Sequence, residues 1–235
     1  MRSISILSLA IFSTILWTSC TECVSPEGPS REESRTITEV REIELAGEID
    51  VLIMPSDTPF LVVRGADNIR QLLRTDLRGH TLRISTEKCV LDDDESQVIV
   101  GMKDLQQVIV GGSGLIATNG LFSPEEIHIG ISGSGEARLQ INAENVATSI
   151  SGSGRIVLEG ITDHLKANVA GSGALDASDL QADNCEVLVA GSGSAEIAAG
   201  RKLRARVNGS GNVRYSGDPE VDIRVTGSGE ITRIH

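Results

Sequence analysis

The chain has 235 residues, a formal net charge of −12 and only 2% aromatic residues. The acidic balance argues against nucleic acid or anionic lipid headgroups as electrostatic partners. So few aromatic rings cannot supply a platform for stacked bases, and they leave little for ring stacking on sugars. The length is ample for one hydrophobic core.

The N-terminus is typical of a secretory signal. Arg2 is followed by an apolar run over residues 4–17, which is too short for a membrane-spanning helix. The run ends in Thr18-Ser19-Cys20, which resembles a bacterial lipoprotein cleavage box, although Trp17 stands where such a box usually has Leu. We expect residues 1–19 to be removed and Cys20 to carry the lipid that anchors the protein to a membrane. Ordinary secretion without a lipid is the alternative.

Residues 20–35 are predicted to be a tether, because prolines, glycine and charged residues replace the apolar pattern there. Cys23 lies in this tether. A disulfide between Cys23 and Cys89 is compatible with an oxidising envelope, but a position in a tether argues against it. Cys185 occupies an inward strand position, where we expect it to behave as a small buried hydrophobic residue.

Residues 36–100 continue the strand pattern, but without the Gly-Ser-Gly tripeptide and around a shorter bend than that of the later repeats. Ile43, Leu45 and Val51 alternate around Gly47, which predicts an earlier coil of the same architecture. The one predicted helix spans residues 67–74, with Asp67 or Asn68 as its N-cap. We expect this segment to help cover the N-terminal end of the fold, and the acidic run at residues 92–95 to form an exposed loop.

Residues 101–235 carry seven copies of Gly-Ser-Gly, spaced 18 to 21 residues apart. A fixed period of this length is the signature of a solenoid, in which each turn buries its apolar side against its neighbours. The first glycines of the seven copies are Gly112, Gly133, Gly152, Gly171, Gly191, Gly209 and Gly227.

Apolar residues flank each tripeptide with a period of two. Around the fifth copy, Val187 and Val189 lie four and two positions before the first glycine, and Ala195 lies two after the last. This alternation predicts a strand, a bend and a second strand in every repeat, and no helix. The sequence therefore predicts an all-β, right-handed parallel β-helix with coils of about 18–21 residues.

The alternation predicts which residues of the tripeptide face outward. Both glycines fall on the inward side, so we expect a tight corner with no room for a Cβ. The serines fall outward and are our candidate binding surface, because a row of hydroxyls both donates and accepts hydrogen bonds. They are Ser113, Ser134, Ser153, Ser172, Ser192, Ser210 and Ser228.

Charges of alternating sign support the same register. Lys166, Glu186, Arg204 and Asp222 each lie five positions before a first glycine. Coils that stack in register place these side chains one above another as cross-strand pairs.

The alternative to a non-catalytic module is a polysaccharide lyase or glycosidase. Asp176 and Glu196 occupy equivalent positions in adjacent repeats, and two carboxylates one coil apart have the separation that a retaining glycosidase needs. Arg138 and Arg214 fall in the same column, which indicates an ion-pair ladder instead. We therefore expect no catalytic residues.

The sequence also predicts no metal site and no cofactor. The four histidines are far apart and lack ligand-type neighbours at metal-binding spacing. Calcium-binding β-rolls repeat every nine residues with Asp after the glycines, which this chain does not do. The histidines are His80, His128, His164 and His235.

Three stretches together resemble a known family. They are Ile43-Glu-Leu-Ala-Gly-Glu-Ile-Asp-Val51, the serial Gly-Ser-Gly bends, and Tyr215-Ser-Gly-Asp-Pro-Glu-Val221 followed by Thr226-Gly-Ser-Gly-Glu-Ile231. Over residues 40 to 235 the chain resembles the auto-transporter adhesin, head GIN domain family. The resemblance implies a β-helical bacterial envelope protein with no established activity.

Together with the cleavage box, this resemblance places the protein in the cell envelope, lipid-anchored at the outer membrane of a Gram-negative bacterium. The partner it implies is an envelope protein or a glycan, and the protein is free to form oligomers.

Overall fold

The computed structural model describes residues 23–91 and 96–234. In this part of the chain, 17 strands and one short helix form an elongated β-solenoid of about seven turns. The predicted β-helical fold is therefore confirmed. The predicted signal peptide (residues 1–19) and Cys20, like the acidic run at 92–95, lie outside the described residues. Within the described residues, no helix has the length and apolar character needed to cross a membrane.

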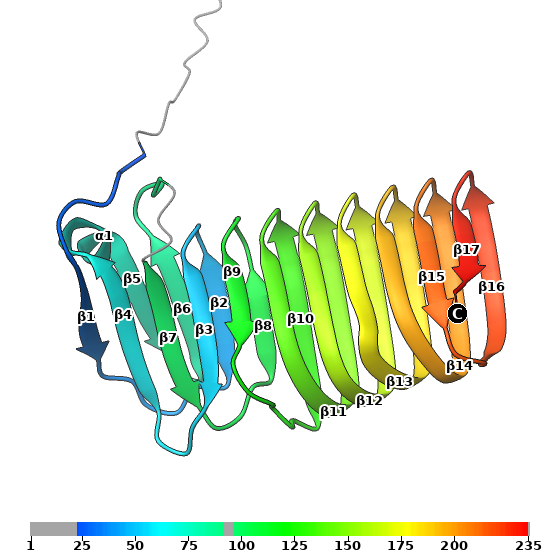
Figure 1. Ribbon diagram of the computed structural model, residues 1–235, viewed down its shortest axis with the longest axis horizontal. Helices are drawn as coiled ribbons and strands as arrows, with labels where there is room; N and C mark the ends of the chain where they lie inside the picture. The colour runs from blue at the N-terminus through cyan, green and yellow to red at the C-terminus, as the bar shows by residue number, and fades with distance from the viewer. Residues whose placement is uncertain (1–22, 92–95, 235) are drawn as a thin grey trace, which may run out of the picture.

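Figure 1 shows the coils side by side along the rod. The helix α1 (Asp67–Leu72) and strand β1 (Ser30–Arg35) lie at one end, and β16 (Glu220–Gly227) and β17 (Glu230–Arg233) lie at the other. Strands in the repeat region pair in parallel with the next coil, one repeat along the chain. The strands between the two ends of this region are β8 (Gln107–Val110), β9 (Leu115–Thr118), β10 (Glu126–Gly133), β11 (Glu136–Gly152), β12 (Arg155–Gly171), β13 (Ala174–Gly191), β14 (Ser194–Gly209) and β15 (Asn212–Ser216).

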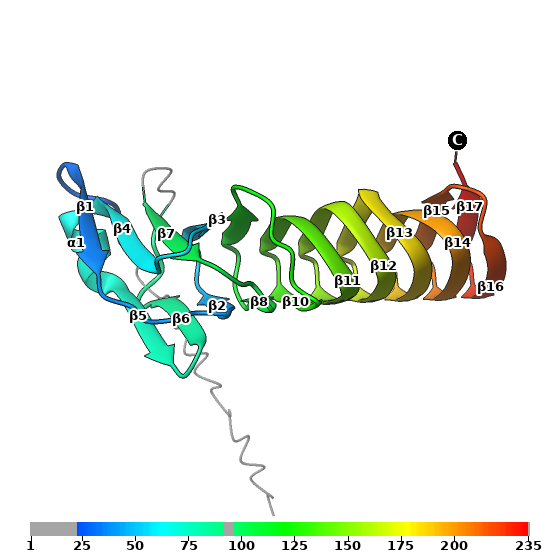
Figure 2. The ribbon, with the colours of Figure 1, turned by 90° about the horizontal axis from the view of Figure 1, so that it is seen from below.

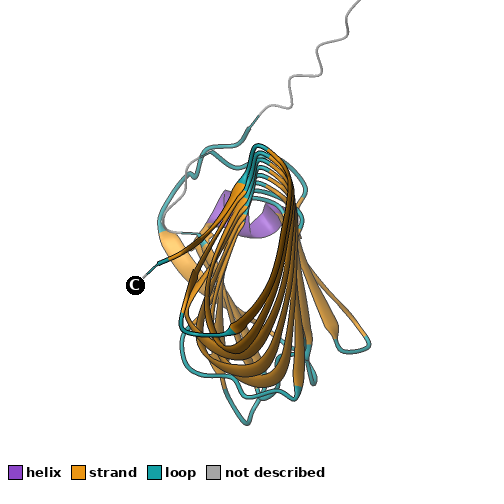
Figure 3. Ribbon diagram, turned by 90° about the vertical axis from the view of Figure 1, so that its right-hand side faces the viewer, coloured by secondary structure: helices purple, strands orange, loops and turns teal. Residues whose placement is uncertain are grey.

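Each coil has one sharp edge and one rounded edge. The sharp edge, which we call the corner edge, is where one strand ends at the first glycine of a tripeptide and the next begins just after the last. At the opposite, rounded edge, β11 to β14 continue without a break, as Figure 2 shows from below. Figure 3 looks along the stack and shows the coils superposed, with the narrow corner at one side of an elongated cross-section.

The period of two in the sequence determines which side chains fill this cross-section. In every coil before the last, the apolar positions beside the tripeptide are mostly buried, and the residues between them are more exposed. Val187, Val189 and Ala195, for example, are at most 2% exposed. The columns run through the whole rod, because the register places equivalent residues of successive coils opposite one another. The core is thus one continuous cluster along the axis.

The N-terminal segment forms coils out of sequence order. The strand pair around Gly47 stacks on β8 and β9, with Ile43 opposite Val108 and Val51 opposite Ile116, so the predicted early coil is present. Its other side pairs with strands that come later in the chain, and these continue in antiparallel pairs to β1 and α1. The strands of this segment are β2 (Glu42–Ala46), β3 (Asp50–Pro55), β4 (Phe60–Ala66), β5 (Leu73–Arg78), β6 (Thr81–Thr86) and β7 (Gln97–Met102).

The prediction of a tether over residues 20–35 is wrong where the structure describes it. Ser30–Arg35 forms β1, which pairs antiparallel with β4, and Val24 forms a bridge with Val90. Cys23 and Cys89 form a disulfide with their Cα atoms 4.5 Å apart. A polar segment becomes ordered here because an edge strand needs only one neighbour and tolerates charged side chains on its exposed side.

The helix is also shorter than predicted. It spans Asp67–Leu72, and the N-cap is Ala66, whose side chain makes no capping hydrogen bond. Asn68 donates instead to the carbonyl of Ser25 and accepts from the amide of Glu27. The amide of Asn68 therefore holds the incoming chain rather than the helix terminus.

Candidate functional site

The corner edge carries the serine column. All seven serines of the tripeptides are exposed, as the alternation predicts. The amide of Ser153 donates to the carbonyl of Gly133 in the preceding coil at 2.9 Å, and Ser172 donates to Gly152 in the same way at 2.9 Å. These repeated backbone bonds hold the hydroxyls in a regular row with the spacing of the strands, about 4.8 Å.

The two glycines of each tripeptide face different ways, which corrects the expectation that both point inward. The second glycine is buried, and a Cβ on Gly173 would lie 2.4 Å from Cγ2 of Ile150 inside the core. The first glycine is not buried; at Gly171 φ is 113° and a Cβ would lie 2.6 Å from the carbonyl oxygen of Gly152. The first glycine is therefore required by close backbone stacking along the rod axis and, in every tripeptide except the one at Gly112, by its positive φ.

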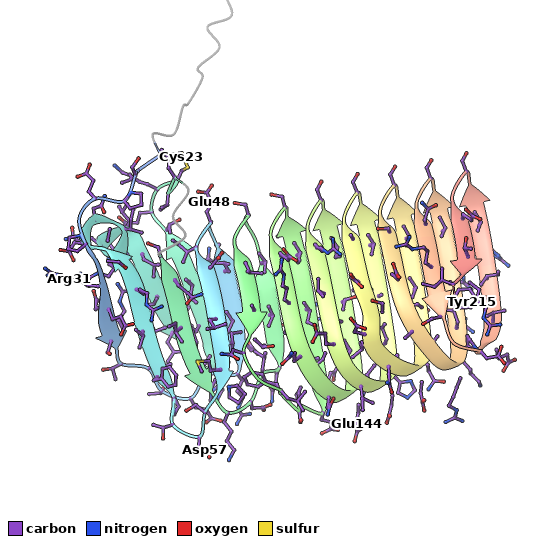
Figure 4. All side chains as sticks on the ribbon, viewed as in Figure 1. Cys23, Arg31, Glu48, Asp57, Glu144 and Tyr215 are labelled. Carbon is purple, nitrogen blue, oxygen red and sulfur yellow. A yellow bond between two sulfur atoms is a disulfide. The ribbon has the colours of Figure 1, made fainter. Side chains whose placement is uncertain are left out.

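Cys23 lies at this same corner edge. Its neighbour Val24 bridges Val90, whose amide donates to the carboxylate of Glu48 at 3.2 Å. Glu48 follows Gly47 in the bend. The carbonyl of Gly47 accepts a hydrogen bond from the amide of Ser113 in the first tripeptide. Figure 4 shows Cys23 and Glu48 at one edge of the rod and Glu144 at the opposite edge. The described chain thus begins beside the serine column and far from the rounded edge.

A polar groove of about 570 Å³ crosses the outer surface of several coils close to the rounded edge. Two columns of outward side chains form its walls, and Leu165, Cys185, Leu203 and Val221 lie between them. The wall nearer the rounded edge consists of Asn145, His164, Asn184, Lys202 and Glu220. The other wall consists of Lys166, Glu186, Arg204 and Asp222.

The second wall is the column of alternating charges predicted from the sequence. Lys166 lies opposite Glu186, Glu186 opposite Arg204, and Arg204 opposite Asp222, which confirms the predicted register. Arg204 and Asp222 form an ion pair at 3.3 Å. Within the described part of the chain, Lys166 and Glu186 form no ion pair, so their charged groups are available to a ligand.

Sequence reasoning identified this column only as evidence of register and missed the groove. The wall nearer the rounded edge consists of residues two positions before those of the charged column in each coil. No repeated tripeptide like that of the corner edge marks the rounded edge in the sequence. A groove is recognised from the distance in space between the two columns of side chains. The sequence pattern of one repeat gives no information about that distance.

The carboxylate pair proposed for glycosidase chemistry is engaged in ion pairs. Asp176 and Glu196 are adjacent in register, as predicted. Asp176 accepts from Arg155 at 3.0 Å and from the hydroxyl of Ser178 at 2.8 Å, while Glu196 pairs with Arg214. Partial burial raises the pKa of Asp176, but the hydrogen bonds from Ser178 and Arg155 outweigh it, so the net pKa lies below the usual value. An ionised carboxylate that is already paired is a poor proton donor.

The remaining chemistry-bearing residues are isolated. Burial raises the pKa of the Cys185 thiol to about 12, so it stays protonated and inert. Among the described residues, no cluster of His, Cys, Asp and Glu side chains has the arrangement of a metal site. His80 lies at the N-terminal coils, with Nδ1 3.3 Å from the carbonyl of Glu39, and His128 is exposed on β10.

Several solved structures have the same fold. One, a putative adhesin from Bacteroides fragilis NCTC 9343, has a TM-score of 0.85 and 22% identity, with 90% of this chain and 100% of that chain covered. A putative lipid binding protein from Parabacteroides distasonis ATCC 8503 has a TM-score of 0.75 and 27% identity, with 91% and 100% covered. A putative adhesin from Parabacteroides merdae ATCC 43184 has a TM-score of 0.70 and 21% identity, with 92% and 100% covered.

No protein of curated function matches the sequence. A family model described as "Putative auto-transporter adhesin, head GIN domain" matches residues 40–219, which is most of the chain and includes the corner-edge glycines up to Gly209. The fold, the serial tripeptides and this match agree, and the chain belongs to the auto-transporter adhesin, head GIN domain family.

Proposed function

We propose that the protein is a non-catalytic lipoprotein of the cell envelope that binds an extended polar chain, such as a glycan, along the polar groove. The family description points to adhesion and to the cell surface. The single observation that carries the proposal is the groove itself, since it crosses several coils and offers charged side chains on both walls and amide side chains on one.

The lipid anchor determines which side of the solenoid is free. Cys20 precedes the disulfide-bonded Cys23 by three residues, which span at most about 10 Å. Lipid on Cys20 therefore holds the corner edge close to the bilayer, without the long tether expected from the sequence. The groove near the rounded edge then faces away from the membrane, which suits a partner outside the cell or in the envelope space.

The composition of the groove favours a polar polymer over an apolar ligand. His164, Asn184 and Lys202 repeat along one wall at the coil spacing of about 4.8 Å, facing carboxylates and cations on the other wall. A ligand with hydroxyl or charged groups at regular intervals finds a donor or an acceptor in every coil. Because aromatic residues are scarce, hydrogen bonds rather than ring stacking supply the specificity.

The serine column is a second polar surface, and it lies at the corner edge, opposite the rounded edge near which the groove lies. With the anchor at Cys20, its hydroxyls face the bilayer, so we assign the column to contacts with lipid headgroups rather than with a distant partner. One of the solved relatives is titled a putative lipid binding protein, which agrees with a place near a membrane for this fold.

A binding measurement with purified protein tests the proposal. The full chain in detergent is immobilised and exposed to peptidoglycan sacculi, an acidic polysaccharide and a neutral polysaccharide. Removing three groove side chains, with His164→Ala, Lys166→Ala and Lys202→Ala together, is expected to weaken the observed binding roughly tenfold or more, since each hydrogen bond to a charged group contributes about 1.5–3 kcal/mol.

A matched variant controls for the loss of charge. His128→Ala, Arg83→Ala and Lys103→Ala together remove the same kinds of group from exposed positions outside the groove. This variant is expected to bind like the parent. Equal binding by the parent and the groove variant, or release of sugar from any of the three probes, would contradict a binding function centred on the groove.

A further inference from the structure

The two ends of the solenoid differ in what covers them. At the N-terminal end, β6 and β7 pair with the outer side of the first coil, and antiparallel strands continue beyond them. At the C-terminal end, among the described residues, β16 pairs only with β14 and β17 only with β15. The last coil in Figure 1 therefore presents open strand edges.

The open end exposes the apolar core. Val221, Ile223 and Val225 are 45%, 47% and 41% exposed, although they stand in the inward columns. Their counterparts in the preceding coil, Leu203, Ala205 and Val207, are at most 1% exposed. A further layer of strands is what buries these columns everywhere else in the rod.

The sequence of β16 is self-complementary when the strand is turned end to end. In an antiparallel pair centred on Ile223, Val221 lies opposite Val225 of the second strand and Ile223 lies opposite Ile223. Opposite residues of an antiparallel pair project to the same face, so all these apolar side chains face one shared interior. On the outer face, Asp222 of each strand lies opposite Arg224 of the other.

Neighbouring registers lack this complementarity. A pair centred on Asp222 places the two Asp222 carboxylates opposite each other, and one centred on Arg224 does the same with the two guanidinium groups. Like charges directly opposite destabilise an antiparallel pair, whereas opposite charges stabilise it. The charges therefore select the register centred on Ile223.

The cation at the open end also lacks a counter-charge. Arg224 lies directly opposite Arg206 of the preceding coil. In the described part of the chain neither guanidinium forms an ion pair. Asp222, by contrast, forms an ion pair with Arg204 of the preceding coil at 3.3 Å on the outer surface of the same copy. The opposite side of Asp222 faces the open end of the rod. A second copy would place its Asp222 beside Arg224 and relieve the repulsion between the two arginines.

We propose that the C-terminal end of the solenoid is a self-association surface, in which β16 pairs antiparallel with β16 of a second copy about a two-fold axis at Ile223. The pairing adds the missing strand to the open edge and buries the inward columns of both copies in one continuous core. An interface of this kind is isologous and closes at two copies. It requires no groove ligand, although Asp222 also lies in the groove wall. Because the two β16 strands run antiparallel, the corner edges of the two copies point in opposite directions, so the pair joins chains that are not held by lipid to one bilayer.

Charge reversal tests the register. Asp222→Arg places two arginines opposite each other in a homodimer, and Arg224→Asp places two aspartates opposite each other. Each variant is expected to weaken dimerisation of the full chain by roughly tenfold or more, measured by sedimentation in density-matched detergent. An equimolar mixture of the two variants restores both Asp–Arg pairs, so it is expected to form a heterodimer of near-parental affinity.

Two controls accompany these variants. Arg83→Asp changes the charge on β6, at the other end of the rod and outside the groove, and is expected to leave dimerisation unchanged. Thermal unfolding of each variant reports whether the fold is intact. A parent chain that is monomeric at every concentration, or a mixture that stays monomeric, would overturn the proposal.

Cysteine substitution tests the position of the two-fold axis in the full chain after solubilisation in detergent. Ile223→Cys places the two sulfurs opposite each other across the axis, within the Cα separation that a disulfide needs. Val225→Cys is a matched control at the same open end, because its counterpart in the second copy lies about 13 Å away along the strand. We expect a covalent dimer on non-reducing gels for Ile223→Cys, none for Val225→Cys, and a dimer again when Val225→Cys and Val221→Cys chains are co-expressed. Equal crosslinking of the two single variants would refute the register.

Discussion

The two glycines of each corner answer different physical requirements. The second, such as Gly173, leaves space for the core, because a Cβ there would meet Ile150. The first, such as Gly171, adopts a positive φ of 113° and lets the main chain approach Gly152 of the preceding coil. The side chain of the serine between them, such as Ser172, is exposed to solvent and does not pack in the core. In each tripeptide, therefore, the first glycine is set by the backbone, the serine faces solvent, and the second glycine is set by packing in the core.

Substitution at a single corner separates these roles. Gly171→Val and Gly173→Val are each expected to lower the free energy of unfolding by about 1–3 kcal/mol, through strained backbone in the first case and overpacking in the second. Ser172→Val is expected to change it by less than about 0.5 kcal/mol. Thermal unfolding of the three variants checks this, and equal losses of stability for all three would contradict the assignment.

One inward column contains a hydroxyl without a partner. Thr148 is 4% exposed and lies between Ile129 and Ala167, and its Oγ1 finds no hydrogen-bond partner among the described residues. Thr148→Val keeps the shape and removes the buried polar atom, so we expect it to stabilise the fold by about 1 kcal/mol.

Thr162 provides the matched control for this change. It is also buried, at 2% exposure, but its hydroxyl donates to the carbonyl of Glu144 at 3.1 Å and lies 3.2 Å from the carbonyl of His164. Thr162→Val should therefore destabilise the protein. Shifts of the melting temperature in the same direction for both variants would show that hydrogen bonding does not distinguish the two sites.

At the scale of elements, the N-terminal segment is held to the solenoid by long-range contacts. The disulfide between Cys23 and Cys89 closes a loop with a sequence separation of 66. Arg35 on β1 donates to the carbonyls of Leu73 and Arg70, which ties the edge strand to α1 and β5. These contacts fix the position of Cys23, and hence the side from which the proposed anchor acts.

Reduction is expected to release this segment while the repeats remain folded. In the chain-entropy model, closing a loop of this length stabilises the linked segment by roughly 4 kcal/mol. Limited proteolysis with and without a reductant should then show rapid cleavage in residues 23–35 only after reduction. A Cys23→Ala, Cys89→Ala variant should be cleaved at the same rate in both conditions. Protection of these residues in the reduced parent would argue that the strand pairing alone holds them.

The elements that the sequence predicts are those whose evidence is local and repeated. The period of the tripeptides and the alternation beside them were sufficient to predict the strands, the inward columns and the register of residues such as Lys166 and Glu186. The strand at Ser30–Arg35 was missed because its partner residues on β4 lie 26 (Arg35 and Leu61) to 36 (Ser30 and Ala66) positions away and its own side chains are polar. The groove was missed because it depends on the distance between two columns.

At the scale of the whole molecule, the proposed anchor gives the two edges of the rod different surroundings. Lipid on Cys20 is expected to bring the corner edge to the membrane. Cys20→Ala should move the protein from the detergent phase to the aqueous phase and abolish labelling with a radioactive fatty acid. A variant that still partitions with membranes would remove the anchor and the orientation derived from it.

The most direct test of the account compares the two candidate surfaces on living cells. Cells carry the parent protein, the groove variant (His164→Ala, Lys166→Ala, Lys202→Ala) or a corner variant with charged residues in place of Ser153, Ser172 and Ser192, and their attachment to a glycan-coated surface is counted. We predict that the groove variant loses attachment and that the corner variant attaches like the parent. Loss of attachment by the corner variant, with the groove variant unaffected, would contradict the account.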